Sequence, residues 1–284
     1  LEVLEGARIV FIATGLGGGT GTGGAPVVAQ ALKEKEEPSR PMVVAVPVLP
    51  FPHERNRIKV AEAALKEIFS LSNSVIPIDN SKLIEVFPRA TVKECRKATD
   101  DILVRAVRSI TELISNQGQL NLDLCDIESV LSFQGQAIIG YGEACGPGRI
   151  DQVIKNTISS PLMSDVSLAG AKAVLINVTA SSDILLEDYI TINEKIVFAA
   201  KAQDVQVFSG LAVDEQLAKR DAIKVTVLAT GLSYAKDSAD VKSMESGIKA
   251  VEPAKSLEPG LKSIEPADEF HEQDFAVSKL QKLK

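Results

Sequence analysis

The chain has 284 residues, of which 45% are hydrophobic and 4% aromatic, and its net charge is -7 because 38 acidic residues outnumber 31 basic ones. This length suffices for two packed domains or one large one, with cores built mainly from Val, Ile, Leu and Ala. The acidic balance argues against a protein that binds duplex nucleic acid, which needs clustered Lys and Arg. We therefore expect no nucleic-acid partner.

Cysteine spacing and hydropathy bear on the cellular compartment. Cys95, Cys125 and Cys145 lie far apart and form no CxxC pair, which argues against a disulfide framework or a metal site made of protein ligands alone. No apolar stretch reaches the roughly 18 residues that span a bilayer, and the first residues do not resemble an export signal. The sequence predicts a cytoplasmic protein without direct membrane insertion.

The first 90 residues alternate between strand-like and helix-like patterns. The strand-like runs are residues 7–13, 41–48 and 74–78, and the helix-like runs are residues 26–32 and 61–71. Runs that are apolar on both faces are typical of parallel strands covered by helices. Pro26 is expected in the first turn of its helix, and Pro47 indicates a strand that is irregular or near an edge. The alternation predicts an α/β fold with a parallel sheet.

Residues 91–117 carry apolar side chains at a 3.6-residue repeat, which predicts a long central helix. Beyond it, strand-like runs at residues 137–142, 171–180, 206–211 and 222–230 alternate with helix-like runs at residues 150–158 and 193–202. This pattern predicts a second, α/β or α+β domain over residues 118–232, after a first domain over residues 1–90.

The composition changes again in residues 233–284. A Glu-Pro pair recurs at residues 252–253, 258–259 and 265–266, each time after a single apolar residue. Frequent proline with isolated apolar side chains cannot build a core, so we expect a disordered tail. Its last 15 residues could form a short helix on a partner, although an unstructured end is the simpler expectation.

Residues 13–26 read ATGLGGGTGTGGAP, a glycine-dense turn between a buried strand and a helix. Such a turn exposes backbone N–H groups beside the positive end of the helix dipole, and glycine lets that backbone approach a di- or triphosphate closely. Thr20 and Thr22 add hydroxyl groups. The alternative is a flexible linker, but a linker would not join a core strand to a helix. We therefore expect a phosphate-binding loop.

Three classes of phosphate loop compete for this segment. The P-loop pattern fails because no Lys follows the glycines. Gly19, Gly21 and Gly24 formally match the GxGxxG fingerprint of nicotinamide-dependent oxidoreductases, yet the next strand ends without the ribose-binding carboxylate. The third class is the GGGTGTG loop of tubulin-like proteins, which the chain matches without a mismatch at Gly17, Gly18, Gly19, Thr20, Gly21, Thr22 and Gly23.

The surrounding sequence resembles the tubulin/FtsZ superfamily, and the bacterial cell-division family FtsZ in particular. The similar segments are PFxxE at residues 50–54, DNSKL at 79–83, NLDLCD at 121–126, ISSPL at 158–162 and VTVLATG at 225–231. The resemblance implies a Rossmann-type GTP-binding domain, a central helix and an activation domain. It also implies a GTPase that polymerises head to tail into filaments at the division site.

The resemblance assigns roles to particular residues. Glu54 is similar to a ribose contact and Arg57 to an arginine near the phosphates, although both could be a solvated charge run. Asn121, Asp123 and Asp126 resemble the loop that enters the nucleotide pocket of the next subunit to support hydrolysis. The alternative for the two aspartates is helix capping.

Base recognition is expected on the central helix. Asp101 matches the position of the family's guanine-binding carboxylate, while Arg96 stands in place of a stacking Phe and Asp100 in place of an Asn. Solvated helix positions are the alternative. The resemblance implies GTP as ligand, with Mg²⁺ held mainly by phosphates and water.

The tail is expected to contact membrane-anchoring and division proteins of unknown identity. Because the sequence starts with Leu1 close to a core strand, we expect the N-terminal part of the GTP-binding domain to be missing, an open edge on the parallel sheet, and no GTP hydrolysis by this segment alone. A second hypothesis is a non-hydrolysing structural paralogue that co-assembles with filaments or caps them.

Overall fold

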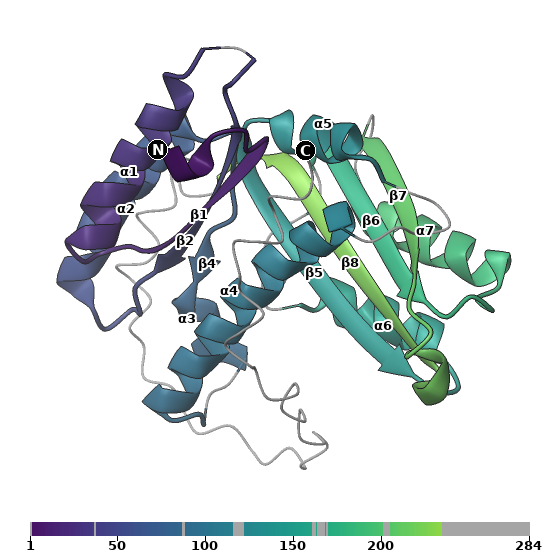
Figure 1. Cartoon of the computed structure of the whole chain (residues 1–284). Coiled ribbons are helices and arrows are strands. Elements are labelled where there is room, and N and C mark those ends of the chain that lie inside the picture. Colours follow the sequence, from purple (N-terminus) through teal and green to yellow (C-terminus); the bar gives the residue numbers. More distant parts are fainter. Residues whose placement is uncertain are drawn as a thin grey trace. The chain divides into compact units, whose positions relative to one another are not determined.

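The computed structural model describes residues 2–36, 38–86, 89–115, 122–160, 163, 168, 170–200 and 205–234 (Figure 1). The chain divides into two units, Leu1–Asp237 and Ser238–Lys284. The second unit, and with it most of the predicted tail, lies outside the described residues. The predicted domain boundaries within the first unit stay a prediction.

The N-terminal elements follow the predicted alternation. They are η1 (Glu2–Leu4), β1 (Ile9–Gly15), α1 (Thr20–Lys33), β2 (Met42–Leu49), α2 (Arg55–Leu71), β3 (Ser74–Val75), β4 (Ile78–Asp79), α3 (Asn80–Val86) and α4 (Val92–Ser115). The long central helix is confirmed as α4. The third strand is divided into β3 and β4, and the short α3 was not predicted.

The start of α1 corrects one prediction. The helix begins at Thr20 and not at Pro26, which lies in its seventh position. Three glycines therefore belong to the first turns of the helix, a conformation that glycine can adopt although it costs about 1 kcal/mol each relative to alanine. Only residues 16–19 form the loop between β1 and α1.

The C-terminal elements match the predicted pattern in type, except for α5, which was expected only under the capping alternative, and η2, which was not predicted. They are α5 (Leu124–Ser132), β5 (Gly135–Cys145), α6 (Arg149–Ile158), β6 (Ala173–Ala180), α7 (Leu186–Ala200), β7 (Gln206–Val213), η2 (Ala218–Arg220) and β8 (Ala222–Leu232). Most of them are longer than predicted, because the apolar runs that mark them end before their hydrogen bonding does.

All the described strands belong to one sheet in the order β1-β2-β3-β5-β8-β6-β7, with β4 also paired to β2. Strands β1, β2, β3 and β5 are parallel, whereas β8 runs antiparallel to both β5 and β6. The predicted parallel sheet is therefore confirmed in the first half and gives way to a mixed sheet in the second. Among the described strands β1 pairs only with β2, which leaves the expected open edge.

Strand β2 shows how the chain accommodates a proline. It lies inside the sheet, so the prediction that Pro47 is near an edge was wrong, but the predicted irregularity is present. Val43 and Ala45 bond across to the β3 side, and Pro47 faces the same side by the two-residue alternation of a strand. The partner there changes from β3 to β4 around Pro47. The missing N–H thus falls where the neighbouring strand is interrupted.

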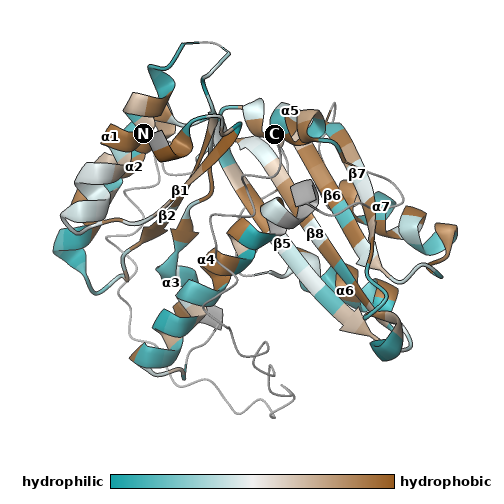
Figure 2. Cartoon of the chain, in the orientation of Figure 1, coloured by the Kyte–Doolittle hydropathy of each residue, from teal (hydrophilic) through white to brown (hydrophobic). Residues whose placement is uncertain are grey.

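Helices cover both faces of the sheet (Figure 1). On one face α4 and α5 pack against the central strands, with Ala106, Ile110 and Ile127 fully buried. On the other face α1 and α2 cover the first strands, and α6 and α7 cover the last ones. Figure 2 shows that β1 is hydrophobic along its length, like the interior strand β2. This layering fixes both ends of β1, where the candidate site residues lie.

Candidate functional site

The loop after β1 is fixed by backbone contacts. The Leu16 amide donates to the Val48 carbonyl at the end of β2 (2.9 Å), and the Gly17 amide donates to the Thr22 hydroxyl (2.9 Å). Helix α1 has no side-chain cap and no acidic residue in its first turn. The positive end of the dipole of a 14-residue helix is therefore not neutralised by its own first turn, which suits an anion.

Two glycines, Gly17 in the loop and Gly21 in the first turn of α1, are required by the fold itself. Gly17 has φ +92°, and a Cβ there would lie 2.8 Å from the Cβ of Arg57. A Cβ at Gly21 would lie 2.2 Å from the carbonyl oxygen of Gly15 and 2.4 Å from the Thr14 hydroxyl. These positions bring the loop, the end of β1 and the first turn of α2 into direct contact.

Three further glycines have no such reason. A Cβ at Gly18, Gly19 or Gly23 would meet no described atom within 4 Å, and none of the three has positive φ. At Gly23, which lies inside α1, alanine would be better by about 1 kcal/mol. The space beside these three glycines is therefore not filled by the described part of the chain.

Glu54 and Arg57 lie beside the loop, and their roles toward a nucleotide stay predictions. Glu54 is the N-cap residue of α2, and its carboxylate accepts from the Phe51 amide (3.1 Å). Arg57 donates to the same carboxylate (2.7 Å) and is 60% exposed. A guanidinium has five N–H donors, so this pairing uses only part of its capacity. The predicted ribose and phosphate contacts are thus placed together at the carboxyl end of the parallel strands.

Helix α4 is anchored near the same edge of the sheet by Asn80. This residue directly follows β4, and its side-chain oxygen accepts from the buried hydroxyl of Thr99 (2.8 Å). The predicted base-binding residues of α4, Arg96, Asp100 and Asp101, are all exposed. Arg96 and Asp100 are four residues apart and lie on the same side of the helix. Asp101 lies on the adjacent side. The anchoring by Asn80 was missed, although the polar DNSKL segment after a strand signals it.

Asp123 and Asp126 form a reciprocal capping box at the start of α5. The Asp126 amide donates to the Asp123 carboxylate (2.7 Å), and the Asp123 amide donates to the Asp126 carboxylate (3.1 Å). The capping alternative is therefore confirmed, and the catalytic role of the pair stays a prediction. Asn121 lies outside the described residues.

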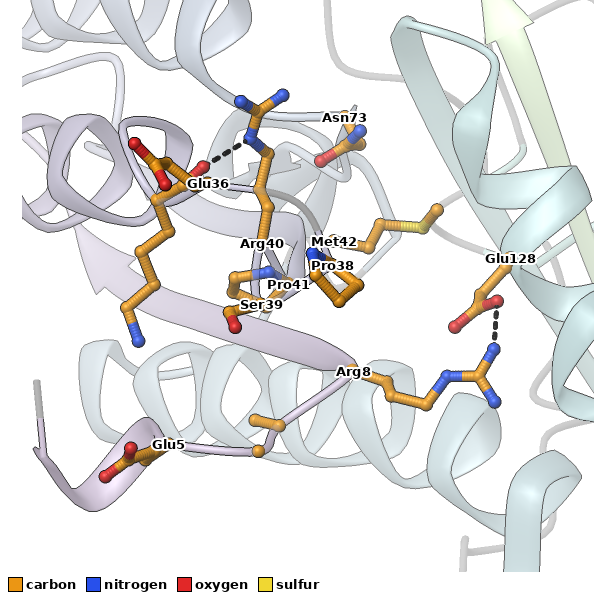
Figure 3. A pocket seen from close by; sticks show the side chains of 13 residues that line it. Glu5, Arg8, Glu36, Pro38, Ser39, Arg40, Pro41, Met42, Asn73 and Glu128 are labelled. Atoms are coloured by element: carbon orange, nitrogen blue, oxygen red, sulfur yellow. Dashed lines mark hydrogen bonds and ion pairs between the residues drawn. The ribbon is translucent and has the colours of Figure 1, made fainter.

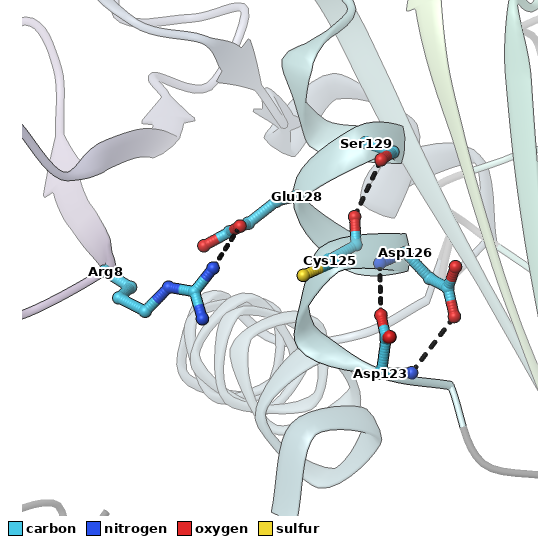
Figure 4. A network of polar contacts seen from close by, with 6 residues as sticks. All are labelled: Arg8, Asp123, Cys125, Asp126, Glu128 and Ser129. Atoms are coloured by element: carbon cyan, nitrogen blue, oxygen red, sulfur yellow. Dashed lines mark hydrogen bonds and ion pairs between the residues drawn. The ribbon is translucent and has the colours of Figure 1, made fainter. Parts of the chain in front are cut away.

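The structure does not bring these carboxylates to the glycine loop of the same chain. Arg8, directly before β1, donates to Glu128 of α5 (2.6 Å; Figure 4). Helix α5 thus lies at the amino end of β1, while the loop follows its carboxyl end. Seven residues of strand separate the two ends by about 20 Å. The pKa of Arg8 is raised, mostly by its hydrogen bond to Glu128 and to a smaller extent by the one to Cys125.

A solvent-open hollow also lies at this amino end (Figure 3). Arg8, Arg40, Met42, Asn73 and Glu128 are among the residues that line it. None of the predicted nucleotide-binding residues does, so this hollow is distinct from the glycine-loop site.

Comparison with known proteins decides the family. Residues 1–88 match the model of the tubulin/FtsZ family GTPase domain, and residues 135–233 match that of the FtsZ family C-terminal domain. The chain belongs to the tubulin/FtsZ family. It is 40% identical to the cell division protein FtsZ of Pseudomonas aeruginosa, over 81% of this chain and 57% of the relative. It is 42% identical to FtsZ 1 of Thermococcus kodakarensis, over 82% and 60%.

Solved structures agree with this membership. An FtsZ dimer from M. jannaschii superposes with a TM-score of 0.71 at 32% identity, covering 81% of this chain and 65% of that one. A TubZ protofilament structure from Bacillus thuringiensis shares the fold at 15% identity, with a TM-score of 0.64. The chain spans 57–64% of the length of the curated FtsZ relatives it matches.

Among the side chains and helices of the described ranges only, two features are absent: a metal cluster and a membrane-spanning helix. No group of three or more His, Cys, Asp or Glu side chains is placed there to hold a metal ion. No described helix combines the length and hydropathy that a membrane crossing requires.

Proposed function

We propose that this chain supplies the main part of a GTP-binding, GTP-hydrolysing protein that assembles head to tail into filaments of the division ring. Its glycine loop holds the nucleotide phosphates, and Asp123 and Asp126 act on the nucleotide of the neighbouring subunit. The observation that carries the proposal is the position of these two groups at opposite ends of β1.

That separation determines how one site could be assembled. Within one chain the carboxylates cannot reach a phosphate on the loop, because about 20 Å of strand lies between them. Head-to-tail stacking of copies along the strand direction would place the amino end of one sheet against the carboxyl end of the next. Such a heterologous contact propagates into a filament, and each contact completes one hydrolytic site.

The glycine loop fits a nucleoside triphosphate. Gly18 and Gly19 leave space at an uncapped helix N-terminus, where backbone amides can donate to phosphate oxygens. Arg57 stands beside them as a charged donor. We assign the ribose to Glu54, and the guanine base to Arg96, Asp100 and Asp101 of α4. A Mg²⁺ ion would be held by phosphate oxygens and water, with charge support from Asp123 and Asp126.

The cellular location of the filament and the partners of the tail belong to the same proposal. We propose that the protein works at the division site and that its tail docks on membrane-anchoring or division proteins. The competing function is a paralogue that co-assembles without hydrolysis, in which Asp123 and Asp126 only cap α5. Activity against protein concentration distinguishes the two.

The test measures phosphate release from GTP by the protein expressed from its whole reading frame. A shared site predicts a specific rate that rises steeply above a threshold concentration, since assembly makes the site. Asp126→Asn should lower the rate above the threshold about 100-fold while GTP binding is retained. A parent rate near zero with GTP still bound would identify the non-hydrolysing paralogue.

Mixing two inactive variants tests action between subunits. Asp126→Asn keeps an intact glycine loop, and Gly19→Val keeps intact carboxylates but fills the space above the loop. An equal mixture should recover about a quarter of the parent rate, because random head-to-tail order joins an intact loop to intact carboxylates at about one contact in four. No recovery from a mixture that still forms filaments would contradict a shared site.

A further inference from the structure

Helix α5 is held against the sheet at three places. At its C-terminal end, Thr230 donates to the Val130 carbonyl (2.6 Å) and Ser74 donates to the Leu131 carbonyl (3.1 Å). Both contacts are buried. Just before the helix, Leu122 packs against Gly210 of β7, where a Cβ would come within 2.8 Å of its side chain. The third place is the ion pair between Arg8 and Glu128.

The ion pair acts at the middle of α5, just after the capping box. Glu128 and Cys125 are three residues apart and both face Arg8, whereas Asp126 points to another side of the helix (Figure 4). Ile127 faces the core. Ile127, Val130 and Leu131 hold one face of α5 on the core, and a contact on a different side adds a further restraint on its rotation about its axis. The rotation decides where the Asp126 carboxylate points.

We propose that Arg8 is a positioning residue for Asp123 and Asp126, which it aims at the neighbouring subunit's nucleotide through its ion pair with Glu128. The inference rests on the proposed function. It assigns to the amino end of β1 a part in the shared site, in which Arg8 acts through Glu128 and α5.

The exposure of the pair separates positioning from structural support. The Arg8 side chain is 56% exposed and that of Glu128 25% exposed, and ion pairs at such exposure add little to stability. A displacement of about 1 Å in a catalytic group can nevertheless cost about 100-fold in rate. Loss of the pair should therefore change turnover much more than melting temperature.

The experiment reverses the charges in the protein expressed from its whole reading frame. Arg8→Glu and Glu128→Arg place like charges together, and each should lower kcat for GTP about 10-fold while GTP affinity is unchanged. The double variant restores an ion pair of opposite polarity and should recover to within about twofold of the parent. Melting temperatures should differ by less than about 3 °C.

Arg220→Glu is the matched control. Arg220 pairs with Glu143 (3.6 Å) at a similar exposure, 66% and 32%, and it lies on η2, away from α5. Its reversal should leave kcat within about twofold of the parent. A double variant as slow as the single ones, or a control as slow as Arg8→Glu, would overturn the assignment of Arg8.

Hydrogen exchange separates this proposal from the function on which it rests. The amides of residues 123–128 should exchange several-fold faster in Arg8→Glu than in the parent, and the double variant should reverse this. If the parent hydrolyses GTP but exchange is unchanged in Arg8→Glu, positioning fails alone. If the parent assembles without hydrolysis, the function fails and the positioning role falls with it.

Discussion

The two ends of β1 differ in the groups that shape them, backbone at one end and side chains at the other. At the carboxyl end the glycine loop is shaped by backbone contacts and by side chains that are absent, as at Gly17 and Gly21. At the amino end the first turn of α5 is shaped by side chains that are present, the reciprocal caps of Asp123 and Asp126 and the pair between Arg8 and Glu128. One end leaves space for a ligand, whereas the other presents charge.

Because of this difference, the two ends should respond differently to mutation. A methyl group added where backbone atoms lie within 3 Å cannot be relieved by a rotamer change, so the cost is large and local. A side-chain contact has substitutes, such as an amide for a carboxylate or a reversed ion pair. We therefore expect all-or-none effects on stability at the loop and graded effects at α5.

The largest effect is expected for Gly21→Ala. The Cβ of the alanine would clash with the Gly15 carbonyl. We therefore expect the free energy of unfolding to fall by about 2–3 kcal/mol and GTP binding to be lost. Gly19→Ala meets no described atom and should cost less than about 1 kcal/mol, yet it should also weaken GTP binding. Urea unfolding and nucleotide titration measure both. Equal stability losses at the two positions would remove the distinction between fold-required and ligand-required glycines.

The sequence predicts the two ends unequally. The GGGTGTG run marks the loop directly, because its chemistry is local and dense in glycine. The 3.6-residue repeat likewise predicts α4. The start of α1 was misplaced because glycine, the usual sign of a loop, is helical at Gly21 and Gly23. A helix boundary in such a segment depends on contacts with β1 that the local sequence does not reveal.

The amino end of β1 could not be predicted from local pattern. Arg8 and Glu128 are 120 residues apart, and only the sheet order places α5 beside the start of β1. Strand β8 lies between β5 and β6, an order that alternating hydropathy does not encode. The sequence therefore predicted the site residues as separate motifs, and the fold supplies their placement at opposite ends of one strand.

A smaller effect is expected at the α5 cap, where two substitutions separate capping from charge. Asparagine caps helices about as well as aspartate, so Asp123→Asn should lower stability by only a few tenths of a kcal/mol. Asp123→Ala loses the cap and should cost about 1 kcal/mol. Both should abolish assembly-dependent hydrolysis if the carboxylate acts on the neighbouring nucleotide. Normal turnover in Asp123→Asn would leave capping as the whole role of this residue.

The smallest effect concerns a second capping box, at the start of α4. Thr91 donates its amide (2.7 Å) and its hydroxyl (2.8 Å) to the Glu94 carboxylate. These bonds, the amide first, lower the pKa of Glu94 below its ordinary value of 4.5. Since the folded pKa is the lower one, the stabilisation is present above pH 4.5 and is lost as the pH falls through the folded value.

An NMR titration of the Glu94 carboxyl carbon measures this shift directly. The midpoint should lie below 4.5 in the parent. In Thr91→Ala it should move part of the way back toward 4.5, because the hydrogen bond from the backbone amide of residue 91 remains when the hydroxyl is removed. Helix α4 should fray at its start only in the acid range, so GTP binding near neutral pH should not change. An unshifted midpoint would mean that the side chains at this exposed cap do not hold their contacts in solution. The cap of α5, made by the same kind of contact, would then be a weaker basis for aiming two carboxylates.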